Sequence, residues 1–172
     1  MYRILTVCTG NICRSPMAQF CLARAFEEAG LGSEVSVDSA GVTAWEAGNP
    51  MDPRAVEELL AHGYDAEQAR RFRAREFQEE WFEDRDLVLA MDFGHLRRLR
   101  ELAAERPDCD KIRLIRSFDP AAADLPPEEQ GIEDPWYGDM TDFDSSYAMI
   151  QASLPGVVQH VRTALGAASG QS

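Results

Sequence analysis

A cysteine and an arginine near the N-terminus have the residue types and the spacing of an anion-binding nucleophilic site. Cys8 ends an apolar run, five residues follow it, and Arg14 precedes Ser15-Pro16, a pair typical of a capped helix start. A loop between a strand and a helix directs several backbone N–H groups at one point, where the helix N-terminus adds partial positive charge. Arg14 supplies a forked donor suited to two oxygens of a tetrahedral oxyanion. The sequence therefore predicts an oxyanion cradle.

The same positive field acts on the sulfur of Cys8. A helix N-terminus or a neighbouring arginine favours the nucleophilic thiolate, and Ser15 could donate a hydrogen bond to it. Attack on a phosphorus atom in the cradle would give a cysteinyl-phosphate, with Arg14 and the N–H groups binding the equatorial oxygens. The alternative is a structural cysteine, because free cysteines are often buried. The coincidence of strand end, glycine, arginine and helix start favours the nucleophile.

The elements that position Cys8 alternate between strands and helices. We expect strands at residues 3–8, 35–41, 86–91 and 112–115, and helices at 15–29, 52–63, 94–104 and 143–165. This alternation predicts a single α/β domain of three layers, with a central four-stranded parallel sheet and helices on both faces. Ligands bind at the carboxyl ends of strands in such sheets, which is where Cys8 lies.

The last third of the chain is expected to be a long loop followed by a helix. Residues 117–141 are rich in Pro, Asp and Gly, and loops of this length are often functional. Pro155-Gly156 interrupts the last helical stripe, where we expect a kink. The domain is expected to span residues 1–166, with 167–172 as a flexible tail.

Charge and composition limit the possible binding partners and the cellular compartment of the protein. The formal net charge of -13 and the isoelectric point of about 4.6 make nucleic acid and anionic lipid poor partners. No apolar run reaches the ~18 residues of a membrane span, and the N-terminal run is too short for a signal peptide. A cytoplasmic location with reduced cysteines is expected. The four cysteines form no CxxC pair and the three histidines lie apart from them, so no structural zinc site is expected. No cofactor is expected.

The segment from Val7 to Ala18, VCTGNICRSPMA, closely resembles the signature of the low-molecular-weight protein tyrosine phosphatases. Three further stretches fit that family in order, namely DSAG at 38–41, AMD at 90–92 and DPWYG at 134–138. The resemblance covers nearly the whole chain and implies a flavodoxin-like phosphotyrosine phosphatase I fold. It implies hydrolysis of phosphotyrosine and aryl phosphate monoesters without a metal. A phosphotyrosine-containing protein would be the substrate, phosphate and similar oxyanions would inhibit, and a monomer is expected.

The resemblance also implies roles for individual residues. Cys8 would be the nucleophile, Arg14 the phosphate clamp, and Asp134 the general acid that later activates water. Asn11 and Ser39 would hold the shape of the phosphate-binding loop, and Ser15 would tune the thiolate. The remaining members of that loop are Thr9, Gly10, Ile12 and Cys13. The chemistry itself demands an acid, because a phenolate leaves better when it is protonated.

Three aromatic residues would wall a deep substrate slot in this family: Trp45, Trp136 and Tyr137. A flat apolar slot suits a phenyl ring and leaves phosphoserine too short to reach the cysteine. Ordinary core packing is the alternative, and for Trp45 the sequence leaves the two interpretations open.

Other functions on the same scaffold stay in view. Members that hydrolyse phosphoarginine tend to carry threonine where Ile12 stands. Arsenate reductases need two more cysteines, and none lies between Cys21 and Cys109. A non-catalytic phosphate-binding module would be expected to lose Cys8 or the acid. Cys13 either forms a reversible disulfide with Cys8 in this family or only fills the loop, and the sequence does not decide between them.

Overall fold

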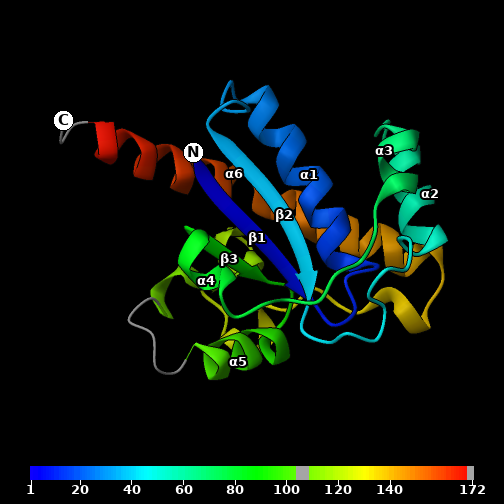
Figure 1. Cartoon of the computed structure of the whole chain (residues 1–172). Coiled ribbons are helices and arrows are strands. Elements are labelled where there is room, and N and C mark those ends of the chain that lie inside the picture. The colour runs from blue at the N-terminus through cyan, green and yellow to red at the C-terminus, as the bar shows by residue number, and fades with distance from the viewer. Residues whose placement is uncertain (104–108, 170–172) are drawn as a thin grey trace.

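The computed structural model describes residues 1–103 and 109–169 and is built around a four-stranded sheet (Figure 1). The strands are β1 (Tyr2–Cys8), β2 (Val35–Gly41), β3 (Leu87–Ala90) and β4 (Ile112–Leu114). They lie in the order β2-β1-β3-β4, and every pair is parallel. Parallel strands need crossover connections, which the helices provide.

The helices form a layer on each face of this sheet. The longer ones are α1 (Arg14–Glu28), α2 (Pro53–Ala61), α5 (Phe93–Leu102) and α6 (Met140–Ser169), and the short ones are α3 (Ala66–Arg71) and α4 (Trp81–Asp84). One apolar cluster joins the sheet to α1, α2 and α6, and a second joins its other face to α4 and α5. The predicted three-layer arrangement is confirmed.

β1 is the central element of the core. Ile4 and Cys8 belong to the cluster on the α1 side, whereas Leu5 and Val7 belong to the cluster on the α5 side. This is the period-two alternation of a strand that is covered on both faces. β1 also pairs with a strand at each edge, so the position of Cys8 at its end is tightly determined.

The start of α1 differs from the expectation that Ser15 caps it. The helix begins at Arg14, its N-cap is Cys13, and no side chain caps it. The Ser15 hydroxyl cannot serve as a cap because it lies 3.0 Å from the sulfur of Cys8 and faces the loop interior. The helix ends as predicted, with Gly30 in the left-handed region at φ 76° directly after the C-cap Ala29.

The segment expected as a loop at 117–141 contains short single-turn helices at its start, middle and end. They are Ile115–Phe118, Pro127–Glu129 and Pro135–Tyr137, and a further turn of this kind, Cys109–Lys111, precedes β4. The segment ends at Asp139, and α6 begins at Met140, three residues earlier than expected. The expected helix end at Ala104 lies outside the described residues.

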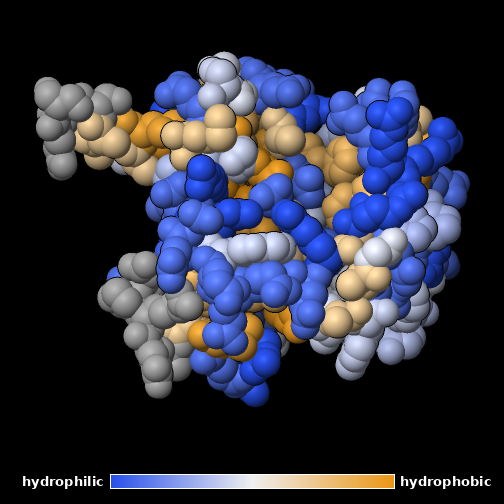
Figure 2. Space-filling model, viewed as in Figure 1, coloured by the Kyte–Doolittle hydropathy of each residue, from blue (hydrophilic) through white to orange (hydrophobic). Residues whose placement is uncertain are grey.

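α6 continues through Pro155 and ends at Ser169. The expected kink stays a prediction. The expected tail boundary at residue 167 falls inside the last turn of the helix, and residues 170–172 lie outside the described part of the chain. Of the helices in the described residues, none has the length and apolar character that crossing a bilayer requires. Hydrophilic residues dominate the face drawn in Figure 2, as the net charge leads one to expect.

The two glycines of α6 allow a matched test of its packing. A Cβ on Gly156 would lie 2.3 Å from the carbonyl oxygen of Phe118, whereas a Cβ on Gly166 would meet nothing within 4 Å. We expect Gly156→Ala to lower the free energy of unfolding by about 1–3 kcal/mol through overpacking. Gly166→Ala should raise it by about 0.5–1 kcal/mol through helix propensity. Chemical denaturation measures both, and equal changes would contradict this account of the close approach at Gly156.

Candidate active site

The loop after β1 is held in shape by the buried side chain of Asn11. Its backbone lies in the left-handed region at φ 61°, which asparagine tolerates better than most residues. The amide nitrogen donates to the hydroxyls of Ser15 at 2.9 Å and Ser39 at 2.8 Å, and the amide oxygen accepts from the backbone N–H of Arg75 at 3.0 Å. These bonds tie the loop to α1, to β2 and to the segment before α4.

The end of β2 closes against the back of this loop. Gly41 pairs with Cys8, and the N–H of Val42 donates to the carbonyl of Cys8 at 2.9 Å. A Cβ on Gly41 would lie 2.6 Å from the oxygen of Thr9 and 3.0 Å from the carbonyl carbon of Gly10. Only glycine permits this approach, which explains its place in the DSAG stretch.

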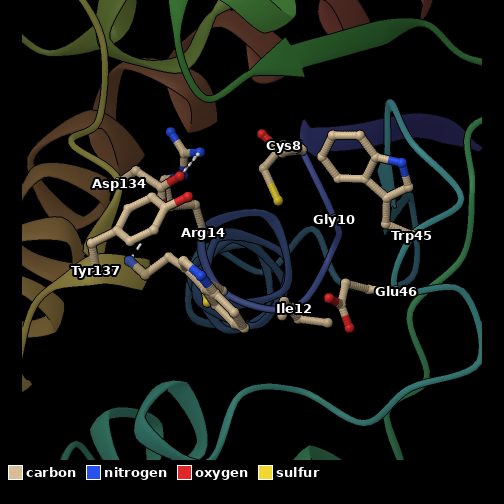
Figure 3. A pocket seen from close by; sticks show the side chains of 11 residues that line it. Cys8, Gly10, Ile12, Arg14, Trp45, Glu46, Asp134 and Tyr137 are labelled. Atoms are coloured by element: carbon tan, nitrogen blue, oxygen red, sulfur yellow. Dashed lines mark hydrogen bonds and ion pairs between the residues drawn. The ribbon is translucent and has the colours of Figure 1, made fainter.

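The sulfur of Cys8 is at the floor of a pocket and receives polar contacts from the loop. The N–H of Asn11 donates to it at 3.3 Å, and the hydroxyl of Ser15 lies 3.0 Å away. Figure 3 shows the sulfur pointing into the hollow that the loop encircles. Two polar groups of the loop and of α1 therefore lie within hydrogen-bonding distance of the sulfur.

The guanidinium of Arg14 is buried beside the pocket and is bound by two carboxylates. Nη1 donates to Asp92 at 2.7 Å and to the carbonyl of Ile132 at 3.1 Å, and Nη2 donates to Asp134 at 2.9 Å. The last two partners come from a segment more than a hundred residues along the chain. Arg14 therefore brings the DPWYG stretch to the loop that follows β1.

Asp134 accepts hydrogen bonds through both of its carboxylate oxygens. One oxygen accepts from Arg14, and the other accepts from the N–H of Trp136 at 3.2 Å and so caps the turn Pro135–Tyr137. The carboxyl group is 42% exposed and lines the pocket. It is thus held by its own loop, yet open to a molecule in the pocket.

The three aromatic residues expected to wall a slot all line this pocket. Trp45 is 80% exposed, Trp136 42% and Tyr137 92%, so none of them is packed in the core. Trp45 and Tyr137 lie on opposite sides of the sulfur in Figure 3. Glu46, which the sequence analysis did not single out, also lines the pocket.

The other expected site residues divide between the pocket and its support. The pocket is also lined by Thr9, Gly10, Ile12 and Cys13. Asn11, Ser15 and Ser39 support the loop instead, through the hydrogen bonds of Asn11 to both serine hydroxyls and the contact of Ser15 with the Cys8 sulfur. The described residues contain no cluster of three or more side chains suited to a metal ion.

Two residues that the sequence analysis gave no role complete the surroundings of Arg14. Asp92 caps α5 by accepting from the N–H of His95 at 2.9 Å, and Nε2 of His95 lies 2.8 Å from the hydroxyl of Thr9. Nδ1 of His95 is 3.1 Å from Asp92 but lacks hydrogen-bond geometry. Burial lowers the pKa of His95 to about 4, against the opposing charge of Asp92. One sequence signal could have identified Asp92 as a site residue. It directly follows a predicted buried strand, and the carboxyl end of that strand lies at the same edge of the sheet as Cys8.

Cys13 differs from Cys8 in its surroundings. Burial raises the pKa of the Cys13 thiol above its ordinary value, and the negative charges of Asp52 and Cys8 add to the effect. Its sulfur therefore stays protonated at neutral pH in this form of the protein. A disulfide between Cys13 and Cys8 stays a prediction, since both are free thiols here.

Comparisons with known proteins agree with this geometry. The family model described as "Low molecular weight phosphotyrosine protein phosphatase" matches residues 3–166. A low molecular weight protein-tyrosine-phosphatase of Streptomyces coelicolor is 45% identical over 94% of each chain. Low molecular weight protein-tyrosine phosphatase A of Mycobacterium tuberculosis is 42% identical, over 88% of this chain and 86% of its own. The crystal structure of a Drosophila arginine phosphatase is 31% identical with a TM-score of 0.79, over 92% of this chain and 96% of that one.

His95 predicts a specific pH dependence of stability. As the pH falls from about 6.5 to about 4, the unfolded chain takes up a proton at this histidine before the folded chain does, so the free energy of unfolding decreases. At about pH 5 the loss should be on the order of 1–2 kcal/mol relative to neutral pH. Chemical denaturation should show that His95→Gln loses less stability than wild type over the same interval. Equal losses in the two proteins would contradict the assignment to His95.

Proposed function

This chain belongs to the low molecular weight phosphotyrosine protein phosphatase family and is a protein tyrosine phosphatase, and we propose that Cys8, Arg14 and Asp134 carry out its reaction. The observation that carries the proposal is the position of the Cys8 sulfur. It points into a pocket beside the guanidinium of Arg14, which also holds the only acidic group of the DPWYG stretch.

In the first step the phosphate of the substrate enters the loop. Its oxygens accept from the backbone N–H groups and from Arg14, and the sulfur of Cys8 attacks phosphorus opposite the phenolic oxygen. The S–P bond forms while the P–O bond breaks, and the carboxyl proton of Asp134 passes to the departing oxygen. The products are a phenol and a cysteinyl-phosphate.

In the second step a water molecule takes the place of the phenol. The Asp134 carboxylate accepts a proton from this water as its oxygen attacks phosphorus. The P–S bond breaks, inorganic phosphate forms, and the sulfur of Cys8 leaves as a thiolate. One carboxyl group thus serves as acid and then as base, and it needs access to the pocket in both steps, in keeping with its exposure.

The two carboxylates around Arg14 suggest how the site accepts its anion. A bound phosphate would replace Asp134 at Nη2, because it offers more negative charge to the same donor. Asp92 and the carbonyl of Ile132 would continue to hold Nη1. Arg14 would therefore keep its orientation while Asp134 turns to the leaving group.

The substrate class follows from the walls of the pocket. Trp45 and Tyr137 stand on opposite sides of the sulfur, and a phenyl ring between them would place its phosphate at the floor. A phosphoserine side chain is too short to span walls of this height. Ile12 places an aliphatic side chain in the pocket, which supports phosphotyrosine over phosphoarginine as the substrate. We also propose a cytoplasmic location, because a reducing compartment keeps Cys8 out of disulfides, and a monomeric protein.

Substitutions of the nucleophile and the acid test the mechanism. Purified protein without added metal should hydrolyse p-nitrophenyl phosphate, and inorganic phosphate should inhibit competitively. Cys8→Ser should abolish turnover and still bind phosphate, because the loop N–H groups and Arg14 remain. Asp134→Ala should slow aryl phosphate hydrolysis by about 10²–10⁴, with the full loss on leaving groups as basic as phenolate. Undiminished turnover in Cys8→Ser would rule out the cysteinyl-phosphate route.

A comparison of substrates tests the slot. We expect kcat/KM for phosphotyrosine to exceed that for phosphoserine and for phosphoarginine, and no reduction of arsenate. Trp45→Ala should raise KM for phosphotyrosine by several-fold while the melting temperature stays within about 2 °C, because an exposed side chain contributes little to stability. Faster hydrolysis of phosphoarginine than of phosphotyrosine would assign the protein to the other substrate class.

A further inference from the structure

Arg54, in the first turn of α2, spans the gap between that helix and the loop that carries Asp134. Its Nη1 donates to the carbonyl of Gly138 at 2.8 Å, and its Nη2 lies 3.2 Å from the carbonyl of Trp136. The guanidinium also lies 4.8 Å from the ring centre of Phe143, near the start of α6. One side chain therefore binds the far end of the DPWYG turn and the helix that follows it.

The guanidinium is itself fixed by Asp52. Nε and Nη2 donate to the two carboxylate oxygens of Asp52 at 3.1 and 2.8 Å, the paired geometry that arginine alone provides. Burial acts to raise the pKa of Asp52, but the hydrogen bonds from Arg54 outweigh it and hold that pKa below its ordinary value. The pair is therefore charged at neutral pH.

Asp52 connects this pair to the phosphate-binding loop. Its backbone N–H donates to the carbonyl of Ile12 at 2.9 Å. A continuous set of bonds thus runs from the loop around Cys8 to the backbone at 136–138. Asp134 lies between Arg14 on one side and this anchored turn on the other.

We propose that Arg54 is a positioning residue that sets the place of the Asp134 carboxyl relative to the phosphate-binding loop. The inference rests on the proposed function of Asp134 as the acid. Arg54 does not line the pocket, and its side chain donates to Asp52 and to the carbonyls of Trp136 and Gly138. It acts by holding two carbonyls of the turn that Asp134 caps. A lysine keeps the charge but cannot reach Asp52 and both carbonyls together.

The test uses aryl phosphates whose leaving groups differ in their need for a proton. Phenolate needs protonation by Asp134, whereas p-nitrophenolate needs it much less. We expect Arg54→Lys to lower kcat/KM for phenyl phosphate by about tenfold or more and that for p-nitrophenyl phosphate by no more than about threefold. The inhibition constant of inorganic phosphate should not change. Arg54→Gln should behave similarly, which provides a second variant if one of them folds poorly.

A double-mutant cycle separates positioning from general loss of structure. In an Asp134→Asn background there is no acid to place, so Arg54→Lys should cause no further loss on either substrate. The control is Arg24→Lys, because Arg24 also donates to a carbonyl, that of His62 at 2.9 Å, and lies over the ring of Tyr64 away from the pocket. It should leave the kcat/KM ratio of the two substrates as in wild type.

The outcomes distinguish the two levels of inference. Equal losses on both substrates, or the same loss in the Asp134→Asn background, would overturn the positioning role while leaving the phosphatase mechanism intact. A wild-type protein without phosphatase activity would overturn the proposed function, and this inference with it. A selective loss on phenyl phosphate that disappears in the Asp134→Asn background is the result that the proposal requires.

Discussion

The active site depends on one strained and buried residue, Asn11, whose left-handed backbone turns the loop after β1 back over the sulfur of Cys8. The strain is offset by three hydrogen bonds from a side chain that is excluded from solvent, and these bonds end on α1, β2 and the segment before α4. Because a buried polar group is costly when it lacks partners, none of these elements can shift alone. The direction of Arg14 and the close approach of Gly41 both follow from this arrangement.

A second constraint is electrostatic. Arg14 is buried in a protein of net charge -13, and burial of an unpaired cation would be strongly destabilising. Asp92, which follows β3, and Asp134, in the segment before α6, both pair with Arg14 and neutralise its charge. The ion pairs therefore have a structural role as well as their place beside the pocket, since they join the N-terminal loop to the C-terminal third of the chain. Arg54 makes a second connection between the same two regions.

The sequence was most informative where a feature is local. The strand before Cys8, the end of α1 at Gly30 and the alternation of elements followed from short-range patterns, and the fold follows those predictions. The predicted N-cap of α1 was wrong by two residues, Ser15 in place of Cys13, because the Ser15 hydroxyl bonds across the loop instead of to its own helix. The contacts of Asp92, His95 and Arg54 were missed because each depends on segments that meet only in the folded chain. Residue type alone does not distinguish these residues from the many charged side chains that only face solvent.

Trp45 and Tyr137, on opposite sides of the pocket, are largely exposed to solvent, whereas Cys8 at its floor is buried. Substitutions at Trp45 or Tyr137 therefore cost the fold little, whereas those at Asn11 or Gly41 would disturb the packing around the sulfur. Substitutions at these exposed positions can thus change which phosphorylated substrates enter the pocket without disturbing the catalytic residues at its floor. Homologues with this fold can therefore differ in substrate preference through a few exposed residues around the pocket while their melting temperatures stay similar.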